Sequence, residues 1–424
     1  MTAMTERRQE AVEALRLSLH GQSIGVLAHF FGGGNILTFD PVYVQLALKR
    51  GPLMTLTQLR IPDMLDKPMI RSHKLDPLLS NLLPEGALRA WMASTLKVDI
   101  DNEFPLMAWT GENLPGAIIA SAVASGEIPD WALSPRDRME PIQMPVNAAA
   151  NKFSLAGVQM KFSSIRTDGR YNINQQEGGD HWIIKTPSTV HRGVPQNEYS
   201  VMRLAEMMGV QIPGIQLVDL TALDNLPDIA LPTETQAYAI RRFDREAEGR
   251  VHAEDFAQIF GFYAHEKYRR VNYEMIGKAI YQYGAEGLED LQQMARRLLA
   301  NILLANGDAH IKNWSMYYPD TRSPRLSPAY DLLSTLPYVK NEREVALNMA
   351  KQKDWYGFDK SVFEQWSDRV GVAWPAIRVH IDDALERARD VWPDMLDELP
   401  MLPEHQEVLR QHWKSLTEDF RIPI

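Results

Sequence analysis

The stretch "LLANILLA" (298–305) runs directly into "NGDAHIKNW" (306–314), and this junction decides the fold. The apolar run closes a longer segment, 288–305, whose apolar residues recur at helical spacing, which predicts a buried helix. The polar stretch then places Asp308, His310, Lys312 and Asn313 within six positions. A buried helix that ends this way is followed either by a simple polar turn or by a loop that carries chemistry.

The residues after this loop predict a β-hairpin. "WSMYY" (314–318) and "RLSPAY" (325–330) flank "PDTRSP" (319–324), which has a strong turn composition. Because paired strands lie about 4.8 Å apart, the hairpin brings its two open ends, Asn313 and Asp331, together near Asp308. Two carboxylates and an amide oxygen are the hard ligands that Mg²⁺ takes together with substrate phosphates.

Composition excludes several other classes of function. The 424 residues suggest two or three domains or lobes, and 45% hydrophobic with 24% charged residues is typical of a soluble globular protein. We expect no signal peptide and no membrane span, and hence a cytoplasmic protein. Cysteine is absent, so disulfides and thiolate sites are excluded, and the scattered histidines lack zinc-ligand spacing. The net charge of −10 argues against autonomous nucleic-acid binding.

The pattern along the chain predicts an α+β protein with two lobes. We expect an N-terminal α/β subdomain over 1–125, a strand-rich lobe over 126–243 and a helical lobe over 244–424. "FGGGN" (31–35) is interpreted as a hairpin turn rather than a phosphate loop, because a strand follows it directly. The stretch 124–152 is rich in proline and polar residues and is interpreted as a linker or a long surface loop.

Phosphoryl transfer in the manner of kinases needs a base Asp, an Asn five residues later, a further Asp, a Lys on a strand and a loop of small residues. Asp308, Asn313 and Asp331 meet the first three needs, Lys185 in "HWIIKTPS" (181–188) meets the fourth, and "SLAGVQ" (154–159) meets the fifth. Taken singly, each has a plain structural interpretation as a turn former or strand end. Their joint occurrence in this order favours a phosphoryl-transfer site.

A helix is expected over "NEYSVMRLAEMMG" (197–209), with Asn197 as its N-cap and Gly209 at its end. Glu198 then has two interpretations. It is placed to pair with Lys185, or it simply favours the positive end of the helix dipole, and the second interpretation is preferred for an acidic residue in a first turn.

These residues together resemble the HipA-like serine/threonine kinases, the toxins of bacterial toxin–antitoxin pairs. The resemblance rests on "SLAGVQMKF", "IIKTP", "NEYSVMRLAEMMGV", "RRFDR", "NGDAHIKN" and "LSPAYDLLS", and it extends into the N-terminal part through "LDPLLSNLLPEGALR" and "FPLMAWTGENLPGAI". It implies a two-lobed protein-kinase-like fold, with a mixed α/β N-terminal region and a predominantly α-helical C-terminal lobe.

The resemblance also implies a role for each matching residue. Asp308 matches the catalytic base, and Asn313 and Asp331 match the ligands of Mg²⁺. Ser154 matches a loop serine that the family autophosphorylates, and a phosphate there would exclude ATP phosphates by charge. The positions implied to contact ATP are Ala156, Gly157, Val158, Gln159, Met160, Lys161, Lys185, Arg241, Arg242, Phe243, His310, Lys312 and Tyr330. Two of them depart from the family pattern, because Met160 and Arg241 stand where acidic residues are common.

The family implies partners as well. Its members phosphorylate aminoacyl-tRNA synthetases and stall translation, and a small helix-turn-helix antitoxin restrains them. We therefore expect DNA to be reached only through such a partner, and no membrane to be involved. Two alternatives stay open. One is a small-molecule kinase of the aminoglycoside phosphotransferase type, which shares the G-D-x-x-x-x-N loop. The other is a kinase-fold co-repressor that works only with its DNA-binding partner.

Overall fold

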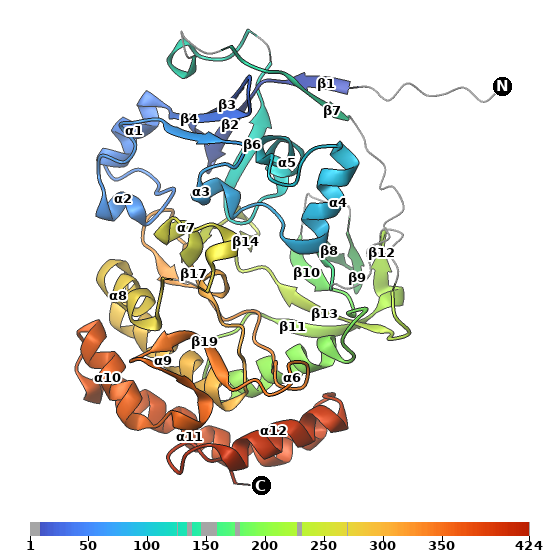
Figure 1. Cartoon of the computed structure of the whole chain (residues 1–424), viewed down its shortest axis with the longest axis vertical. Coiled ribbons are helices and arrows are strands. Elements are labelled where there is room, and N and C mark those ends of the chain that lie inside the picture. Colours follow the sequence, from blue (N-terminus) through green and yellow to red (C-terminus); the bar gives the residue numbers. More distant parts are fainter. Residues whose placement is uncertain are drawn as a thin grey trace, which may run out of the picture.

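The chain folds into three successive units, which Figure 1 shows from the blue N-terminal strands to the red C-terminal helices. The structure is a computed structural model and describes residues 9–124, 126–133, 138–145, 159–173, 179–226, 231–268 and 270–423. Ser154, Ala156, Gly157 and Val158, for which the sequence predicts roles, lie outside the described residues. In the described part of the chain, no helix combines the length and apolar character that a membrane span requires.

The N-terminal unit is built on a five-stranded antiparallel sheet with the order β5-β4-β3-β2-β6. The strands are β2 (Ala14–Leu19), β3 (Gln22–Phe30), β4 (Gly34–Phe39), β5 (Met69–Ser72) and β6 (Ile118–Ala122). The helices are α1 (Pro41–Leu48), α2 (Thr57–Arg60), α3 (Pro77–Ser80), α4 (Gly86–Leu96) and α5 (Glu103–Thr110). The turn predicted at 31–35 joins β3 to β4. Apolar side chains of the sheet and of these helices form one core cluster.

Part of the stretch interpreted as a linker is regular structure. β7 (Ile142–Pro145) pairs antiparallel with β1 (Gln9–Val12), and Met144 and Ile142 contact the core of the N-terminal unit. The expectation of an unstructured linker over the whole of 124–152 was therefore wrong for its described C-terminal part. Proline and polar residues mark a turn-rich segment, but they do not exclude a short edge strand.

The middle unit is a six-stranded sheet with the order β11-β13-β10-β8-β9-β12, and the helix α6 (Val194–Met207) packs against β13 and β11. The strands are β8 (Lys161–Thr167), β9 (Arg170–Asn172), β10 (Asp180–Lys185), β11 (Ile215–Asp219), β12 (Leu223–Asp224) and β13 (Gln236–Arg241). Lys185 ends β10 and lies opposite Lys161 at the start of β8. The register therefore brings two lysines to one end of the sheet.

The start of α6 differs from the prediction. Gly193, with a φ of 69°, precedes the first helical residue, and Pro195 stands in the first turn. Proline is favoured there because it needs no hydrogen-bond partner for its nitrogen, so the helix begins before Asn197. Asn197 is therefore not the N-cap; it is buried inside the helix and exchanges hydrogen bonds of 2.9 and 3.0 Å with the backbone of Ser334.

The last unit is mainly helical and packs around the buried helix α9, as the apolar run at 288–305 predicts. Its helices are α7 (Phe256–Phe260), α8 (Tyr273–Tyr283), α9 (Gly287–Leu303), α10 (Lys360–Val370), α11 (Trp374–Glu398) and α12 (Pro403–Ser415). Its short strands are β14 (Arg245–Glu246), β15 (Gly249–Arg250), β16 (His252–Asp255), β17 (Ser315–Tyr318), β18 (Arg325–Leu326), β19 (Glu344–Met349) and β20 (Gln352–Asp354). In Figure 1, α10, α11 and α12 form the end of the molecule opposite the N-terminal unit.

Buried polar contacts attach the N-terminal unit to the rest of the molecule. The carboxylate of Glu254, in β16, accepts hydrogen bonds from the Thr55 hydroxyl (2.7 Å), the Leu56 backbone N–H (2.6 Å) and the Tyr318 hydroxyl. Burial raises the pKa of Glu254 to about 7. A second anchor is the Asp244 carboxylate, which accepts the Gly116 N–H at 2.8 Å.

We expect Glu254→Ala to lower the free energy of unfolding by about 3 kcal/mol, because it leaves three buried donors without an acceptor. Urea denaturation followed by tryptophan fluorescence measures this change. Glu364→Ala on the exposed face of α10 is the matched control and should stay within about 0.5 kcal/mol of the wild type. Equal stability of the two variants would show that the Glu254 contacts do not hold the units together.

Candidate active site

A buried lysine joins the middle unit to the helical unit. The side chain of Lys185 is only 4% exposed, and its ammonium group forms ion pairs with the carboxylates of both Glu198 and Asp331. Lys161 also contacts Asp331, with 3.1 Å between Nζ and Oδ2. Asp331 has a φ of 54°, in the left-handed region that residues other than glycine rarely adopt. Such a backbone conformation in a polar cluster is typical of functional sites.

The charged groups in this cluster stabilise one another in their ionised forms. Burial opposes the charged form of Lys185, but the carboxylates of Asp331 and Glu198 raise its pKa above the ordinary value. Burial also opposes ionisation of Asp331, yet Lys161 and Lys185 hold its pKa far below the ordinary value. Burial raises the pKa of Glu198, and the pairing with Lys185 opposes that rise. Of the two interpretations of Glu198, the structure therefore supports the ion pair with Lys185.

The loop that follows α9 is held by its own backbone contacts. The Asp308 N–H donates to the side-chain oxygen of Asn306 at 3.0 Å, and the Asn313 amide donates to the Asp308 carbonyl at 2.8 Å. Trp314 and Tyr273 both donate to the Ala309 carbonyl, at 3.1 and 3.0 Å. These bonds fix the loop while the Asp308 side chain stays 44% exposed and open to solvent.

His310 and Lys312 have different surroundings. Burial lowers the pKa of His310 to about 4, so its imidazole is neutral near pH 7. The Lys312 ammonium group donates to Asp255 at 2.8 Å and to the side-chain oxygen of Asn81 at 2.9 Å, and it lies 3.2 Å from Glu85. Asn81 and Glu85 belong to the N-terminal unit, so that unit reaches the loop directly.

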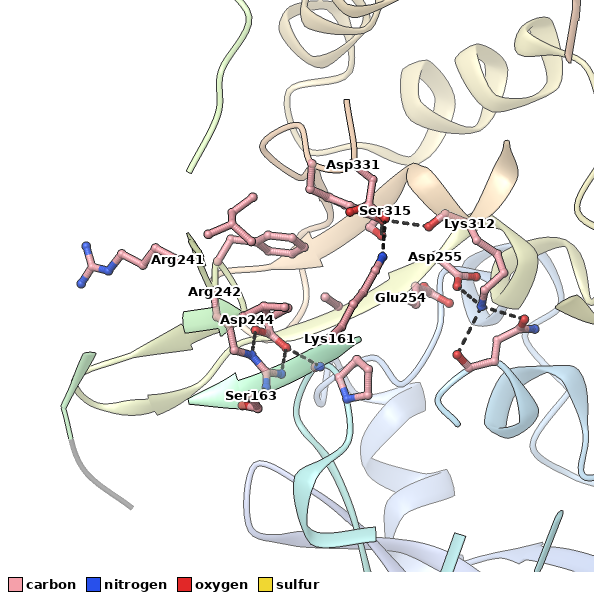
Figure 2. A pocket seen from close by; sticks show the side chains of 18 of the residues that line it. Lys161, Ser163, Arg241, Arg242, Asp244, Glu254, Asp255, Lys312, Ser315 and Asp331 are labelled. Carbon is pink, nitrogen blue, oxygen red and sulfur yellow. Dashed lines mark hydrogen bonds and ion pairs between the residues drawn. The ribbon is translucent and has the colours of Figure 1, made fainter. Parts of the chain in front are cut away.

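A cavity of about 340 Å³ lies where the three units meet, and Figure 2 shows its polar lining. One wall is aromatic: the rings of Phe243 and Tyr330 stack with 5.8 Å between their centroids. Phe162, Ile183 and Ile240 add apolar surface. The cavity is thus a mostly apolar slot whose lining also carries charged side chains on more than one side, among them Arg242 with Asp244 and Lys312 with Asp255.

The two arginines beside Phe243 form ion pairs with carboxylates, so neither places an unpaired positive charge in this slot. Arg242 is buried and makes a two-bond ion pair with Asp244, at 2.8 and 2.6 Å. Arg241 points away from the cavity in Figure 2 and pairs with Asp180 at 2.9 Å. Contacts of Arg241, Arg242 and Phe243 with a nucleotide stay predictions.

A second cavity, of about 580 Å³, contains the three residues that the hairpin argument brings together. Asp308, Asn313 and Asp331 all line it, and the predicted hairpin is present, with Met316 opposite Leu326. The two cavities share four lining residues, which are Lys161, Lys185, Lys312 and Asp331. The second cavity therefore meets the first at a cluster of three lysines and one aspartate.

The described part of the small-residue loop is Gln159, Met160 and Lys161. All three residues line the second cavity. Met160 is buried and packs against Leu88 and Trp91 of α4. The methionine that departs from the family pattern thus forms an apolar contact with the N-terminal unit.

Sequence reasoning missed the residues that the N-terminal unit and the sheet add to the site. These are Asn81, Glu85, Gly116, Phe162, Ile183 and Ile240. Sequence reasoning also missed Tyr268 of the helical unit, which contacts Asp308. The signal for Asn81 and Glu85 was the segment "SNLLPEG" (80–86), which is polar and carries a Pro and a Gly between two helices. A turn of this kind marks an exposed loop but does not show what the loop faces.

Comparisons with known proteins identify the family. The model of the HipA-like C-terminal domain matches residues 153–392, and the model of the HipA N-terminal domain matches residues 15–121. A relative from Sinorhizobium fredii that carries the name kinase Y4dM is 37% identical, over 95% of this chain and 96% of its own length. The serine/threonine-protein kinase toxin HipA of Shewanella oneidensis is 24% identical, over 81% of this chain and 82% of its own.

A solved structure confirms the fold. The Shewanella oneidensis HipA chain, in a complex of HipA, HipB and operator DNA, aligns with a TM-score of 0.68 and 20% identity over 95% of each chain. The class of protein is therefore a two-lobed α+β protein with a kinase-like fold, as predicted. The chain belongs to the HipA-like kinase family.

We expect Lys185→Met to destabilise the fold in a pH-dependent way, because it leaves the buried Glu198 carboxylate without a cation. The pKa of Glu198, already raised by burial, rises further, so the unfolded state loses this proton at a lower pH than the folded state. Stability is therefore retained near pH 5 and lost as the pH rises toward about 8, where the deficit should reach about 3–5 kcal/mol.

Urea denaturation at both pH values measures this deficit. Lys353→Met, at an exposed ion pair with Glu344, is the matched control and should show little deficit at either pH. A Lys185→Met deficit that does not change with pH would contradict the assignment of an ion pair to Lys185 and Glu198.

Proposed function

We propose that this protein is an ATP-dependent serine/threonine protein kinase that acts as the toxin of a toxin–antitoxin pair. The observation that carries the proposal is the meeting of two cavities at Lys161, Lys185, Lys312 and Asp331. One cavity is a mostly apolar slot, and the other holds an exposed carboxylate, Asp308. Such a pair suits a reaction in which a phosphoryl group leaves one bound molecule and enters another.

The first cavity suits the nucleotide. An adenine ring would lie in the apolar slot, against the stacked pair Phe243 and Tyr330. The phosphates would then extend toward Lys161 and Lys185, whose positive charges are sustained by Asp331 and Glu198. Lys185 is a point charge at the end of a strand, which is the place that kinases give to their phosphate-binding lysine.

The second cavity suits the acceptor. Asp308 is the proposed base: its carboxylate would accept the proton of a serine or threonine hydroxyl as that oxygen attacks the γ-phosphorus. The hydrogen bonds around Asn306 and Ala309 hold the loop still, so that the carboxylate keeps its direction. The imidazole of His310, with Nε2 at 3.9 Å from Asp308, is neutral near pH 7 and therefore places no positive charge beside the proposed base.

Asn313 and Asp331 fit Mg²⁺. The side-chain amide of Asn313 donates to the Asp308 carbonyl, which leaves its oxygen free to face the cavity that Asp331 also lines. The described residues contain no group of three or more His, Cys, Asp or Glu side chains that could hold a metal, which suits an ion that takes one or two protein ligands and otherwise phosphate and water. When bound, Mg²⁺ would neutralise charge on the β- and γ-phosphates.

The substrate and partners follow from the family. The target would be an aminoacyl-tRNA synthetase, whose phosphorylation would inhibit translation in the cytoplasm. Phosphorylation of Ser154 would silence the kinase. A solved relative is a HipA in complex with HipB and operator DNA, which supports a HipB-like helix-turn-helix antitoxin as partner and DNA contact through it.

We expect Asp308→Asn to reduce phosphoryl transfer at least about 1,000-fold while unfolding stays within about 0.5 kcal/mol of the wild type, because the side chain is exposed and carries little packing energy. The assay incubates purified protein with γ-labelled ATP and a cell lysate, and gel autoradiography with mass spectrometry then locates the label. Label on Ser154 and on a synthetase is the expected result.

Two results would contradict the proposal. Label only in small molecules would favour a small-molecule phosphotransferase. Growth arrest on expression that persists with Asp308→Asn would favour a co-repressor that needs no chemistry. The control variant is Asp359→Asn, at the partly buried N-cap of α10, which should phosphorylate as the wild type does.

A further inference from the structure

The hydroxyl group of Tyr268 donates a hydrogen bond to the carboxylate of Asp308. Tyr268 follows the short helical turn Ala264–Glu266 and precedes α8. Its ring meets the ring of His310 edge-on, with 5.2 Å between centroids, and the Lys267 ammonium lies 5.3 Å from its ring centre. The side chain is 48% exposed, so these few contacts, and not a packed core, hold it in place.

A substrate hydroxyl group that is to receive the phosphoryl group would have to donate the same kind of hydrogen bond to Asp308. A general base must lie within hydrogen-bond reach of the proton that it removes. Within the described chain, no hydrogen bond other than that of Tyr268 reaches the Asp308 carboxylate. A hydroxyl group on a side chain of the protein itself thus stands where a serine or threonine hydroxyl would have to lie.

The space beside this contact is walled by the N-terminal unit. Leu83, Pro84 and Leu88 give apolar surface to the second cavity, which Asp308 also lines. Glu85, on the same wall, lies 3.2 Å from Lys312 of the loop, which fixes the wall against the loop. None of these wall residues lines the apolar slot. The second cavity is therefore separate from the slot except at the shared lysine cluster.

We propose that the second cavity binds the hydroxyl-bearing segment of a protein substrate against residues 83–88. Until that segment binds, the hydroxyl group of Tyr268 occupies the hydrogen-bonding position on Asp308 that the substrate hydroxyl takes when it displaces Tyr268. The inference rests on the proposed kinase function and deepens it. The ligand is an extended peptide with an apolar side chain beside the serine or threonine, because Leu83, Pro84 and Leu88 give apolar surface to the cavity that Asp308 lines. The N-terminal unit then takes part in selecting the substrate.

The transfer step balances with these groups. The acceptor oxygen forms a bond to the γ-phosphorus of ATP, and the bond from that phosphorus to the β,γ-bridging oxygen breaks. The bridging oxygen keeps the electron pair as ADP leaves, and the hydroxyl proton passes to Asp308. Tyr268 takes no part in the chemistry; it competes for the hydrogen bond.

The first test is Tyr268→Phe in the full chain, which keeps the ring and removes the competing hydroxyl. The probe is a degenerate serine/threonine peptide library with γ-labelled ATP. We expect the KM for peptide to fall about 3- to 10-fold, with the KM for ATP and kcat unchanged within about twofold. An unchanged peptide KM, or a kcat that falls with Tyr268→Phe, would overturn the inference, the latter because it makes Tyr268 a residue that orients Asp308.

The second test fills the cavity with Leu88→Trp. We expect the KM for peptide to rise at least about 10-fold while affinity for a fluorescent ATP analogue falls no more than about threefold, because Leu88 does not line the slot and reaches the loop before β8 only through its contact with Met160. Ile70→Trp, at an exposed position of β5 in the same unit, is the matched control, and thermal denaturation checks that both variants fold. A folded Leu88→Trp protein with an unchanged peptide KM would overturn the proposed wall.

Wild type and Asp308→Asn accompany both tests, so that the two proposals fail in different ways. If the wild type labels neither peptide nor any protein of the lysate, the kinase function itself is wrong, and the inference falls with it. If it labels lysate protein but no peptide, the inference alone is wrong. If the wild type transfers phosphate and Asp308→Asn does not, an unchanged Tyr268→Phe or Leu88→Trp counts against the inference alone.

Discussion

The ion pairs of Lys185 are the interaction on which the site depends. A lysine that is almost fully buried costs free energy unless acidic groups surround it, and Lys185 has two. Glu198 comes from the helix that packs on the sheet, and Asp331 comes from the chain that returns after the β17–β18 hairpin. Each partner belongs to a different part of the fold. The pair interactions thus fix the sheet, α6 and the helical unit relative to one another at the place where chemistry is proposed.

Polar contacts also attach the N-terminal unit to the other two units. Glu254 and Asp244 accept hydrogen bonds from its backbone, and Lys312 reaches Asn81 and Glu85. The contacts of Glu254 and Asp244 are buried, and a buried polar group that loses its partner costs more than an exposed one. Movement of the N-terminal unit would therefore change the surroundings of Lys312, which lines both cavities.

Local patterns made much of this predictable. Helix α9, the loop after it and the β17–β18 hairpin lie close together in the chain, and a turn between two strands sets which ends meet. The convergence of Asp308, Asn313 and Asp331 followed from that geometry. Lys185 was predictable as a strand residue, but its pairing with Glu198 was not favoured, because the start of α6 was placed too late. Gly193 and Pro195 begin the helix earlier and turn Glu198 inward.

The parts that could not be predicted are contacts across long sequence separations. Glu85 and Lys312 are far apart in the chain, and no periodicity or spacing relates them. The same holds for the hydrogen bond between Tyr268 and Asp308, which depends on where the segment before α8 lies relative to the loop. Motifs identify groups that can do chemistry, whereas the groups that admit or exclude a substrate come from packing between units. With the substrate bound against residues 83–88 as proposed, selection would be a property of the interface between the units, and a chain could keep every catalytic motif while its selectivity changes.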